Sequence, residues 1–511
     1  MIYLIIAIIA VLIYFYGTRN FSYWNKRGVK HDDPIPVFGN NFRQFFQMIS
    51  ITDIVAEQYQ KYPDEKVVGF YRANEPRLIL RDPELIKKVL VTDFPYFYSR
   101  GLNPHKDVIE PMLKNLFFAD GDLWKLLRQR ITPAFTSSKL KAMFPLIVER
   151  TQKLQQIAAT AASLQEEVDI RDLMARYTTD FIGACGFGIE ADALNDEDST
   201  FRRLGKRVFT VTKRDAFIVL VKLIMPKLFK NLPFLDPDIE KNSVALVKSI
   251  MEQRNYKPCG RNDFIDLLLE LKEKGKIIGE SIENRKSDGT PLAAELELDD
   301  LLMTAQVLVF FVAGFETSSS ATSYTLNQIA FHPEVQKKCQ DEIDTVLRKY
   351  DNKLCYDAVK EMQYLDMTFK EGMRLFPSLG FLIRKSEKQY TFEDIGLTID
   401  AGIPIMIPLQ ALHNDEKYFE NPEQFMPERF HPKNADDLKK HVYLPFGVGP
   451  RACIGERLGH MQSLAGIAAI LHKFSVAPSK NSLKRPIHDP SSIIVQSIQG
   501  GLPLMLYARN S

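Results

Sequence analysis

The most informative segment of the chain reads Pro445-Phe446-Gly447-Val448-Gly449-Pro450-Arg451-Ala452-Cys453-Ile454-Gly455. Its glycines open a loop whose backbone N–H groups can face the sulfur of Cys453, and apolar periodicity from Arg457 to Phe474 predicts a helix just after it. A helix N-terminus stabilises a thiolate, and a buried thiolate needs a partner such as a metal. Gly455 leaves room for a flat macrocycle, and Arg451 can reach an anionic group on its edge. The alternative is a buried structural cysteine beside a glycine-rich turn.

These residues resemble the haem-binding signature of the cytochrome P450 family, Phe-x-x-Gly-x-Arg-x-Cys-x-Gly, at Phe446, Gly449, Arg451, Cys453 and Gly455. The resemblance implies haem b (iron protoporphyrin IX) with the Cys453 thiolate as its axial ligand. It also implies a mainly α fold with smaller β patches, in one large haem domain. It covers nearly the whole chain and is nearest to insect microsomal, xenobiotic-metabolising members, which the segment Phe187-Gly188-Ile189-Glu190-Ala191 supports.

A second constellation is Trp124-x-x-x-Arg128. Its i, i+4 spacing puts an indole N–H and a guanidinium on one helix face, where both can donate to a carboxylate. In the family this pair holds a haem propionate, and Arg384 matches another family arginine that reaches a propionate. Two propionates carry two negative charges, which Trp124, Arg128, Arg384 and Arg451 would then meet.

A third constellation is Ala313-Gly314-Phe315-Glu316-Thr317, within an apolar segment that predicts a buried helix. Glycine inside a helix costs about 1 kcal/mol relative to alanine, so its presence suggests a role. Thr317 can bond back to the carbonyl of Ala313 and open a pocket there. Glu316 and Thr317 resemble the family's acid–alcohol pair, which delivers protons during oxygen activation. A packing glycine and a helix-satisfied threonine are the alternative.

A fourth constellation is Glu371-x-x-Arg374, with Arg429 further along the chain. An arginine fork shared with a carboxylate makes a strong charge-assisted network. By resemblance these three residues form a structural triad that fixes the core around the haem. His413 is interpreted as a structural histidine without a catalytic role.

The N-terminus predicts a membrane anchor. Ile2 to Tyr16 are almost wholly apolar, and Arg19, Lys26, Arg27 and Lys30 follow. No lysine or arginine precedes the apolar run, so the positive-inside rule places the N-terminus in the lumen and the rest in the cytosol. A cleaved signal peptide is the alternative, but a basic start and a small-x-small site are both missing. We therefore expect a single-pass protein of the endoplasmic reticulum membrane.

Three regions are expected along the chain: an anchor at 1–18, a basic and proline-containing connector at 19–40, and a haem domain at 41–511. Within the last, Val67 to Tyr71 and Arg77 to Leu80 predict a β-hairpin.

Further along, helices dominate from Pro83 to Lys272, and Lys272 to Leu298 predicts a mobile surface loop because it is charged and glycine-rich. Leu301 to Phe315 predicts a buried central helix, and a second β-rich patch extends from about Phe381 to Pro408. Phe217 to Leu235 is apolar and dotted with lysines, which fits equally a core helix with a turn or a lip that dips into the membrane interface.

Composition narrows the classes of function. The 511 residues are 45% hydrophobic and 25% charged, which excludes a disordered or collagen-like chain. A formal net charge of +2 gives no basic face for nucleic acid. The odd number of cysteines, without a CxxC pair, fits neither a disulfide scaffold nor a zinc module; they are Cys185, Cys259, Cys339, Cys355 and Cys453.

The resemblance further implies a monooxygenase that inserts one oxygen atom from O2 into a lipophilic substrate. Because no flavin or dinucleotide module is apparent, electrons must come from an NADPH-dependent cytochrome P450 reductase, with cytochrome b5 as a second donor. Lys125, Arg130, Lys439 and Lys440 are candidates for a cationic docking patch, or form an ordinary solvated surface. By resemblance, the substrate pocket draws on Phe117, Phe118, Phe310, Phe311, Ala313 and Phe381.

Several alternatives remain open at this point. Plant toxins and insecticides fit a detoxifying enzyme, whereas a hormone or lipid precursor fits a biosynthetic hydroxylase. A haem-thiolate isomerase would need no reductase but often lacks the acid–alcohol pair, which is kept here. A non-catalytic lipophile-binding protein would not need Cys453 and the proton relay together.

Overall fold

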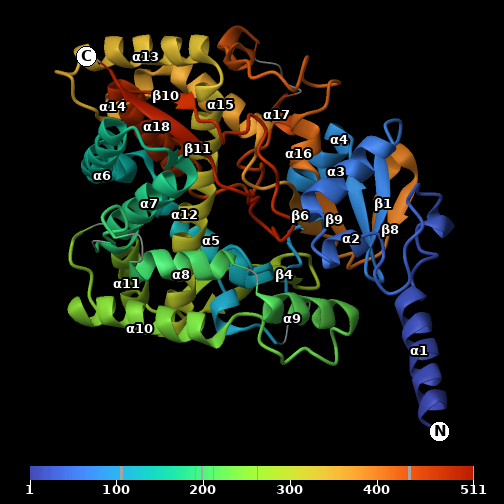
Figure 1. Ribbon diagram of the computed structural model, residues 1–511. Coiled ribbons are helices and arrows are strands. Elements are labelled where there is room, and N and C mark those ends of the chain that lie inside the picture. Colours follow the sequence, from blue (N-terminus) through green and yellow to red (C-terminus); the bar gives the residue numbers. More distant parts are fainter. Residues whose placement is uncertain are drawn as a thin grey trace.

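The computed structural model describes residues 1–103, 108–189, 191–196, 199–210, 212–261, 263–434 and 439–509. Helices form most of the body, and the small sheets are distributed over it: the strands at 67–80, 382–385 and 404–407 lie on one side, whereas those at 474–478 and 503–508 lie among the helices on the other, as Figure 1 shows. The expected mainly α fold with β patches is thereby confirmed. The segment Phe187 to Ala191 contains Glu190, which lies outside the described residues.

The central helix is α12, Asp300–Ala330, which begins where the side chain of its N-cap Asp299 accepts from the N–H of Leu302. It packs against α7 (Ile170–Ile182), α15 (Gln363–Leu375) and α18 (Glu456–Lys473). Within the described part of the chain, α12 alone is long and apolar enough to cross a membrane, but 61% of its apolar window is buried in the protein. The predicted buried helix is therefore confirmed, and it continues to residue 330.

The remaining helices surround α12. Before it come α1 to α6: Ile2–Thr18, Phe42–Phe45, Ile51–Lys61, Pro83–Lys87, Gly121–Ile131 and Ser137–Leu164. After α7 follow α8 to α11: Thr200–Phe209, Lys213–Ile224, Pro237–Gln253 and Phe264–Glu273. Beyond α12 lie α13, α14, α16 and α17: Pro333–Arg348, Tyr356–Glu361, Leu409–His413 and Lys439–Val442.

The largest sheet has four strands in the order β1-β2-β9-β6. The strands β1 (Val67–Arg72) and β2 (Glu75–Leu80) form the predicted hairpin. The second predicted β patch supplies β6 (Leu382–Lys385) and β9 (Pro404–Ile407), with β7 (Tyr390–Phe392) and β8 (Leu397–Ile399) as a separate pair. Parallel pairing of Leu78 with Ile405 joins the two patches. A three-stranded sheet contains β10 (Phe474–Pro478), β11 (Pro503–Ala508) and β3 (Val168–Asp169).

The prediction that the segment from Lys272 to Leu298 forms a mobile loop is wrong. The segment forms an antiparallel hairpin of β4 (Ile277–Arg285) and β5 (Pro291–Leu296) that packs on α5. The turn closes where the N–H of Lys286 donates to the carbonyl of Thr290, and Gly289 adopts a φ of +84°. Ile277 and Ser281 are buried between exposed charged residues, so the buried face of the strand was hidden by charge in the sequence.

The N-terminal helix α1 projects from the body in Figure 1, and most of its side chains are exposed. Its last turn and the following residues are fastened to the body. A Cβ atom on Gly17 would lie 2.9 Å from Val37, and Trp24 is fully buried against Gly69 of β1. The indole N–H of Trp24 donates to the carbonyl of Phe70 at 3.3 Å. The connector is therefore part of the folded body.

The lysine-dotted segment Phe217 to Leu235 begins within α9 and ends in turns. Phe217 is 60% exposed and Leu228 is 71% exposed, so a fully buried core helix does not describe it. In the view of Figure 1, α9 lies on the lower side of the molecule, the side toward which α1 projects.

Candidate functional site

The loop before Cys453 is shaped by two glycines in the left-handed region, Gly447 (φ +69°) and Gly449 (φ +77°). A Cβ atom on Gly449 would lie 2.1 Å from the carbonyl oxygen of Leu90, so no other residue fits there. The loop turns back on itself where the N–H of Cys453 donates to the carbonyl of Phe446 at 2.8 Å. Helix α18 then begins at Glu456, which places the sulfur near a helix N-terminus.

The side chain of Cys453 is exposed, although protein surrounds it closely enough for desolvation to raise the pKa of the thiol. The N–H of Gly455 and the charges of Arg128 and Arg100 act in the opposite direction on that pKa. The exposure of the sulfur and the raised pKa of the thiol are both explained if the sulfur faces a space inside the protein. Since the thiol form is favoured without a ligand, a stable thiolate there requires a metal.

The central helix borders the same kind of space. Ala313 is exposed although α12 passes through the core, and Val309, one turn earlier, is partly exposed. A Cβ atom on Gly455 would meet no protein atom closer than 3.9 Å. From these exposed side chains we infer an open chamber between α12 and the Cys453 loop, which would fit a flat group placed against Cys453.

Four arginines gather beside this chamber, from four different segments. Burial lowers the pKa of Arg451 to about 8, of Arg384 to about 9 and of Arg100 to about 10, and their mutual repulsion adds to the effect. Burial also lowers the pKa of Arg128. Among the described residues, the carboxylate that offsets the charge of this group is Asp120, which accepts from Arg451 at 2.8 Å.

The cluster therefore has more positive charge than its own acids balance. Among the described residues, Nε of Arg384 and Nη1 of Arg451 are buried without a hydrogen-bond partner. Buried unpaired guanidinium groups are costly unless an anion meets them. Two propionates would supply the missing acceptors, so the residues fit haem.

Arg100 and Asp120 were missed by sequence reasoning as parts of this cluster. The side chain of Asp120 accepts from the N–H groups of Arg100 and Gly101 at 2.8 and 3.0 Å. Neither residue lies in a recognisable motif. Their signal was only an arginine and an aspartate at the two ends of the segment that precedes α5.

Trp124 and Arg128 of α5 both contact the cysteine loop, but they do so through different partners. The guanidinium of Arg451 stacks over the ring of Trp124 at 4.2 Å. Arg128, in contrast, donates through Nη1 to the carbonyl of Ala452 at 2.8 Å, the residue before Cys453. Arg128 thus joins α5 directly to the cysteine loop.

Glu316 and Thr317 are adjacent in α12 but have different partners. The hydroxyl of Thr317 donates to the carbonyl of Ala313 at 2.6 Å, beside the open chamber. Glu316 is 8% exposed and forms an ion pair with Arg171 of α7, which also donates to the hydroxyl of Tyr324 at 2.9 Å. The acid is therefore held by a partner that sequence reasoning did not identify.

The three residues of the expected triad lie in direct contact. Glu371 accepts from Arg374 at 2.7 and 2.9 Å and from Arg429 at 3.2 Å. Arg374 also donates to the carbonyl of His413 at 2.8 Å, and Nε2 of His413 accepts from the N–H of Leu444 at 3.0 Å. Burial and the charge of Arg374 lower the pKa of His413 to about 3. This network connects the triad to the start of the cysteine loop.

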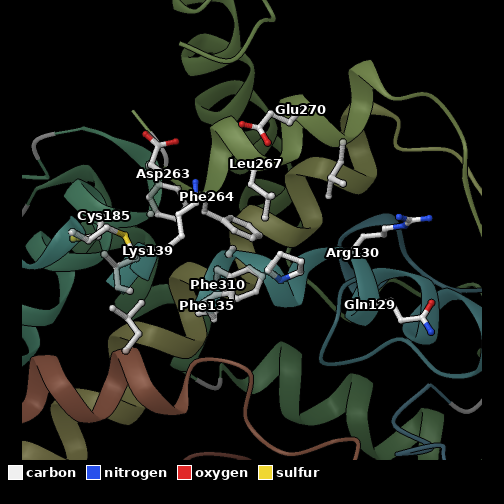
Figure 2. A pocket seen from close by; sticks show the side chains of 18 of the residues that line it. Gln129, Arg130, Phe135, Lys139, Cys185, Asp263, Phe264, Leu267, Glu270 and Phe310 are labelled. Carbon is white, nitrogen blue, oxygen red and sulfur yellow. The ribbon is translucent and has the colours of Figure 1, made fainter. Parts of the chain in front are cut away.

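The structure departs from the expected substrate pocket at two phenylalanines. Phe310 stacks on Phe135 (5.3 Å between ring centroids) and packs at a tilt against Phe264 (4.0 Å). These three rings line a separate cavity of about 330 Å³ between α5, α11 and α12, which Figure 2 shows. Phe311 is buried and stacks on Phe315, because it lies on the side of α12 opposite Ala313.

The other expected aromatic residues of the pocket are all partly exposed. Phe117 and Phe118 are partly exposed, and Arg100 lies 4.5 Å over the ring of Phe117. The side chain of Gln306 in α12 accepts from the N–H of Leu116 at 2.9 Å and so fastens this segment to the central helix. Phe381 is partly exposed beside β6.

The expected cationic patch is described only in part. Lys125 lies 3.8 Å from Glu280 of the β4–β5 hairpin, and Arg130 donates to the carbonyl of Ile278 at 3.1 Å. The side chains of Lys439 and Lys440 lie outside the described residues. Lys125 and Arg130 therefore both contact the β4–β5 hairpin.

Comparison with known proteins gives consistent matches along the chain. The model of the family described as Cytochrome P450 matches residues 30–503. The chain is 36% identical to Cytochrome P450 6B2 of Helicoverpa armigera, covering 99% of this chain and 98% of that protein. It is 38% identical to Cytochrome P450 6a2 of Drosophila melanogaster (98% of each chain) and 36% identical to Cytochrome P450 9e2 of Blattella germanica (99% and 97%).

Proposed function

The chain belongs to the cytochrome P450 family, and from that premise we propose that it oxidises lipophilic foreign compounds with electrons that a reductase delivers from NADPH. As a family member it is a haem-thiolate monooxygenase. The observation that carries the proposal is the meeting of Cys453, the exposed face of α12 and an under-neutralised arginine cluster around one chamber.

The residues divide the work of such an enzyme. Haem, when bound, supplies the activation of dioxygen and the transfer of one oxygen atom to the substrate. Cys453 would hold its iron, and Trp124, Arg128, Arg384 and Arg451 would hold its propionates, with Arg100 as a fifth group. The small side chain of Ala313 leaves space above the Cys453 loop.

Proton delivery is assigned to two neighbouring residues of α12. The Thr317 hydroxyl is held at the chamber by the Ala313 carbonyl, and it can pass on a proton while accepting another. Glu316 is the adjacent acid, and its ion pair with Arg171 fixes where the carboxylate lies. Breaking that pair would free the carboxylate to accept or release a proton.

The substrate class follows from an apolar, aromatic lining. Phe117, Phe118 and Phe381 suit planar or terpenoid lipophiles. Plant toxins and insecticides are such compounds, and the similarity to insect P450s supports this choice. An endogenous hormone or lipid has the same general chemistry, and a substrate screen separates these two possibilities.

The proposal includes attachment to the endoplasmic reticulum membrane. Helix α1 is 17 residues long, or about 26 Å, close to the roughly 30 Å hydrocarbon core of a bilayer. The exposed Phe217 and Leu228 would dip into the same membrane surface, with neighbouring lysines at the headgroups.

The first experiment is the absorption spectrum of the reduced, carbon monoxide-bound protein. A strongly red-shifted thiolate-type Soret band is expected, and Cys453→Ala should abolish it while the exposed Cys259→Ser leaves it unchanged. A histidine-type band, or none in well-folded protein, would refute the haem-thiolate assignment. Turnover that required both NADPH and reductase would then exclude an isomerase and a passive carrier.

A further inference from the structure

The β4–β5 hairpin grips one side of α5 through a network of hydrogen bonds. The carboxylate of Asp122 accepts from the Ser281 hydroxyl at 2.7 Å and from the N–H of Ile282 at 2.6 Å. In return, Glu283 accepts from the N–H of Asp122 at 3.2 Å. A Cβ atom on Gly121 would lie 2.3 Å from Glu283, so the contact is close. The hairpin is thus a fixed cover on α5.

This cover contacts a part of the α5 surface next to the part that Arg128 presents to the cysteine loop. Residues 122, 125 and 130 of α5 contact the hairpin, whereas Arg128 bonds to Ala452 next to Cys453. Helix α5 therefore contacts both the hairpin and the cysteine loop.

The hairpin also changes the charge of this side. Between residues 276 and 297 it carries five acidic and three basic residues, whereas α5 carries three basic residues and one acidic residue. Glu280 is 75% exposed and lies 3.8 Å from the Lys125 ammonium group. Arg130 is exposed, and Arg457, at the start of α18, is exposed and donates to Ser137 at 3.2 Å. Cations from α5 and α18 thus flank the cysteine loop, and Glu280 offsets one of them.

We propose that the β4–β5 hairpin weakens the docking of an acidic electron-donor protein on this side of the molecule, because Glu280 neutralises Lys125. The inference rests on the proposed function, since it assumes an external donor. Exposed charges at the edge of an interface act mainly on the association rate and its salt dependence. Glu280 therefore sets how readily the donor binds and leaves the chemistry at Cys453 unaffected.

The test compares two single charge removals on the same hairpin. Glu280→Gln frees Lys125, whereas Glu295→Gln removes an equal charge from a pair with Lys276 at 3.1 Å on the hairpin itself. Haem-loaded full-length protein is placed in phosphatidylcholine vesicles, and the Kd for NADPH-dependent reductase is measured at low and high salt. Glu280→Gln should bind about threefold more tightly at low salt. The gain should vanish near roughly 0.5 M salt, where screening is nearly complete, and Glu295→Gln should match the parent.

Equal or weaker binding of Glu280→Gln, or an equal gain in both variants, would overturn the proposal. Turnover driven by an organic hydroperoxide, which needs no protein donor, should be the same in all three proteins. A parent protein without activity either with NADPH and reductase or with the hydroperoxide would refute the proposed function instead, and the Kd comparison would still decide the role of the hairpin.

Discussion

The Thr317 hydroxyl donates to the main-chain carbonyl of Ala313, one turn earlier in α12, at 2.6 Å. Ala313 is the residue whose exposed side chain opens the chamber. The same hydrogen bond thus holds a hydroxyl at the chamber by means of a main-chain carbonyl of the helix itself. Local helix geometry and a proton-carrying group are combined at one position.

We expect Thr317→Ala to separate electron consumption from product formation. A positioned proton donor contributes roughly 100-fold to a reaction step, so the share of NADPH electrons found in product should fall to about a tenth or less. Haem content should remain unchanged. Thr304→Ala is the matched control, because Thr304 makes the same bond to Asp300 at 2.7 Å but is buried. Full coupling in Thr317→Ala would disprove the relay.

Arg384→Met should act in opposite directions on the haem-free and haem-loaded protein. The Nε atom of Arg384 has no partner among the described residues, and Nη1 donates only to the carbonyl of the neighbouring Ile383. Removing this buried charge should stabilise the haem-free protein by about 1–3 kcal/mol. It should accelerate haem loss by about tenfold, because a charge-assisted bond to a propionate disappears.

Thermal unfolding of the haem-free protein and haem transfer to an apoglobin measure the two effects of Arg384→Met. Arg254 serves for comparison, because it is paired with Asp263 at 2.7 Å and Asp266 at 2.6 Å. Arg254→Met should destabilise both forms. Destabilisation of haem-free Arg384→Met would contradict the idea of an uncompensated charge.

Glu371→Gln should be strongly destabilising. Glu371 and Arg374 are completely buried, and the carboxylate also accepts from Arg429 and from the N–H of Met426. Its neutralisation leaves two arginines without their counter-charge, which typically costs about 3–5 kcal/mol. Urea unfolding followed by tryptophan fluorescence measures this cost, and the exposed Glu361→Gln should leave the midpoint unchanged. A similar midpoint for both variants would show that the triad adds little stability.

The buried His413 predicts a dependence of stability on pH. Because its pKa is lowered to about 3 in the folded protein, the unfolded chain, with a pKa near 6.5, binds the proton first as the pH falls. Stability from His413 is therefore present above about pH 6.5 and is lost progressively toward pH 3, by up to about 1.4 kcal/mol per pH unit.

Urea midpoints between pH 4.5 and 7.5 test this dependence. His413→Asn retains an acceptor for the N–H of Leu444 and should flatten the slope, whereas the exposed His431→Asn should retain the slope of the parent. An identical slope in His413→Asn would show that other groups cause the pH dependence.

Sequence reasoning succeeded where a few contiguous residues specify the chemistry. The glycines before Cys453 and the i, i+4 bond of Thr317 follow from backbone rules alone, so the motif predicted the local geometry. The β1–β2 hairpin and the buried part of α12 followed from hydrophobic pattern. These features depend on residues close together in sequence.

The errors arose where partners are distant in sequence. Arg171 meets Glu316 across 145 positions, and Asp122 meets Ser281 across 159, so neither contact leaves a local pattern. Phe310 lines the cavity with Phe135, whereas Val309 and Ala313 are the residues of this part of α12 that face the chamber, a difference set by helical phase. In the β4–β5 hairpin, the many charged residues concealed from the sequence pattern that buried and exposed positions alternate along the first part of β4.

The burial of Trp24 against Gly69 has a mechanical consequence. In the proposed membrane attachment, the last turn of α1 packs on Val37 and Trp24 packs on β1, which joins the membrane helix rigidly to the catalytic body. A helix of about 26 Å cannot lean far in a hydrocarbon layer of roughly 30 Å without thinning it. The catalytic body is then held at one height above the bilayer and at one tilt relative to it. Bilayer thickness thereby becomes a variable that sets how deep the chamber entrance sits.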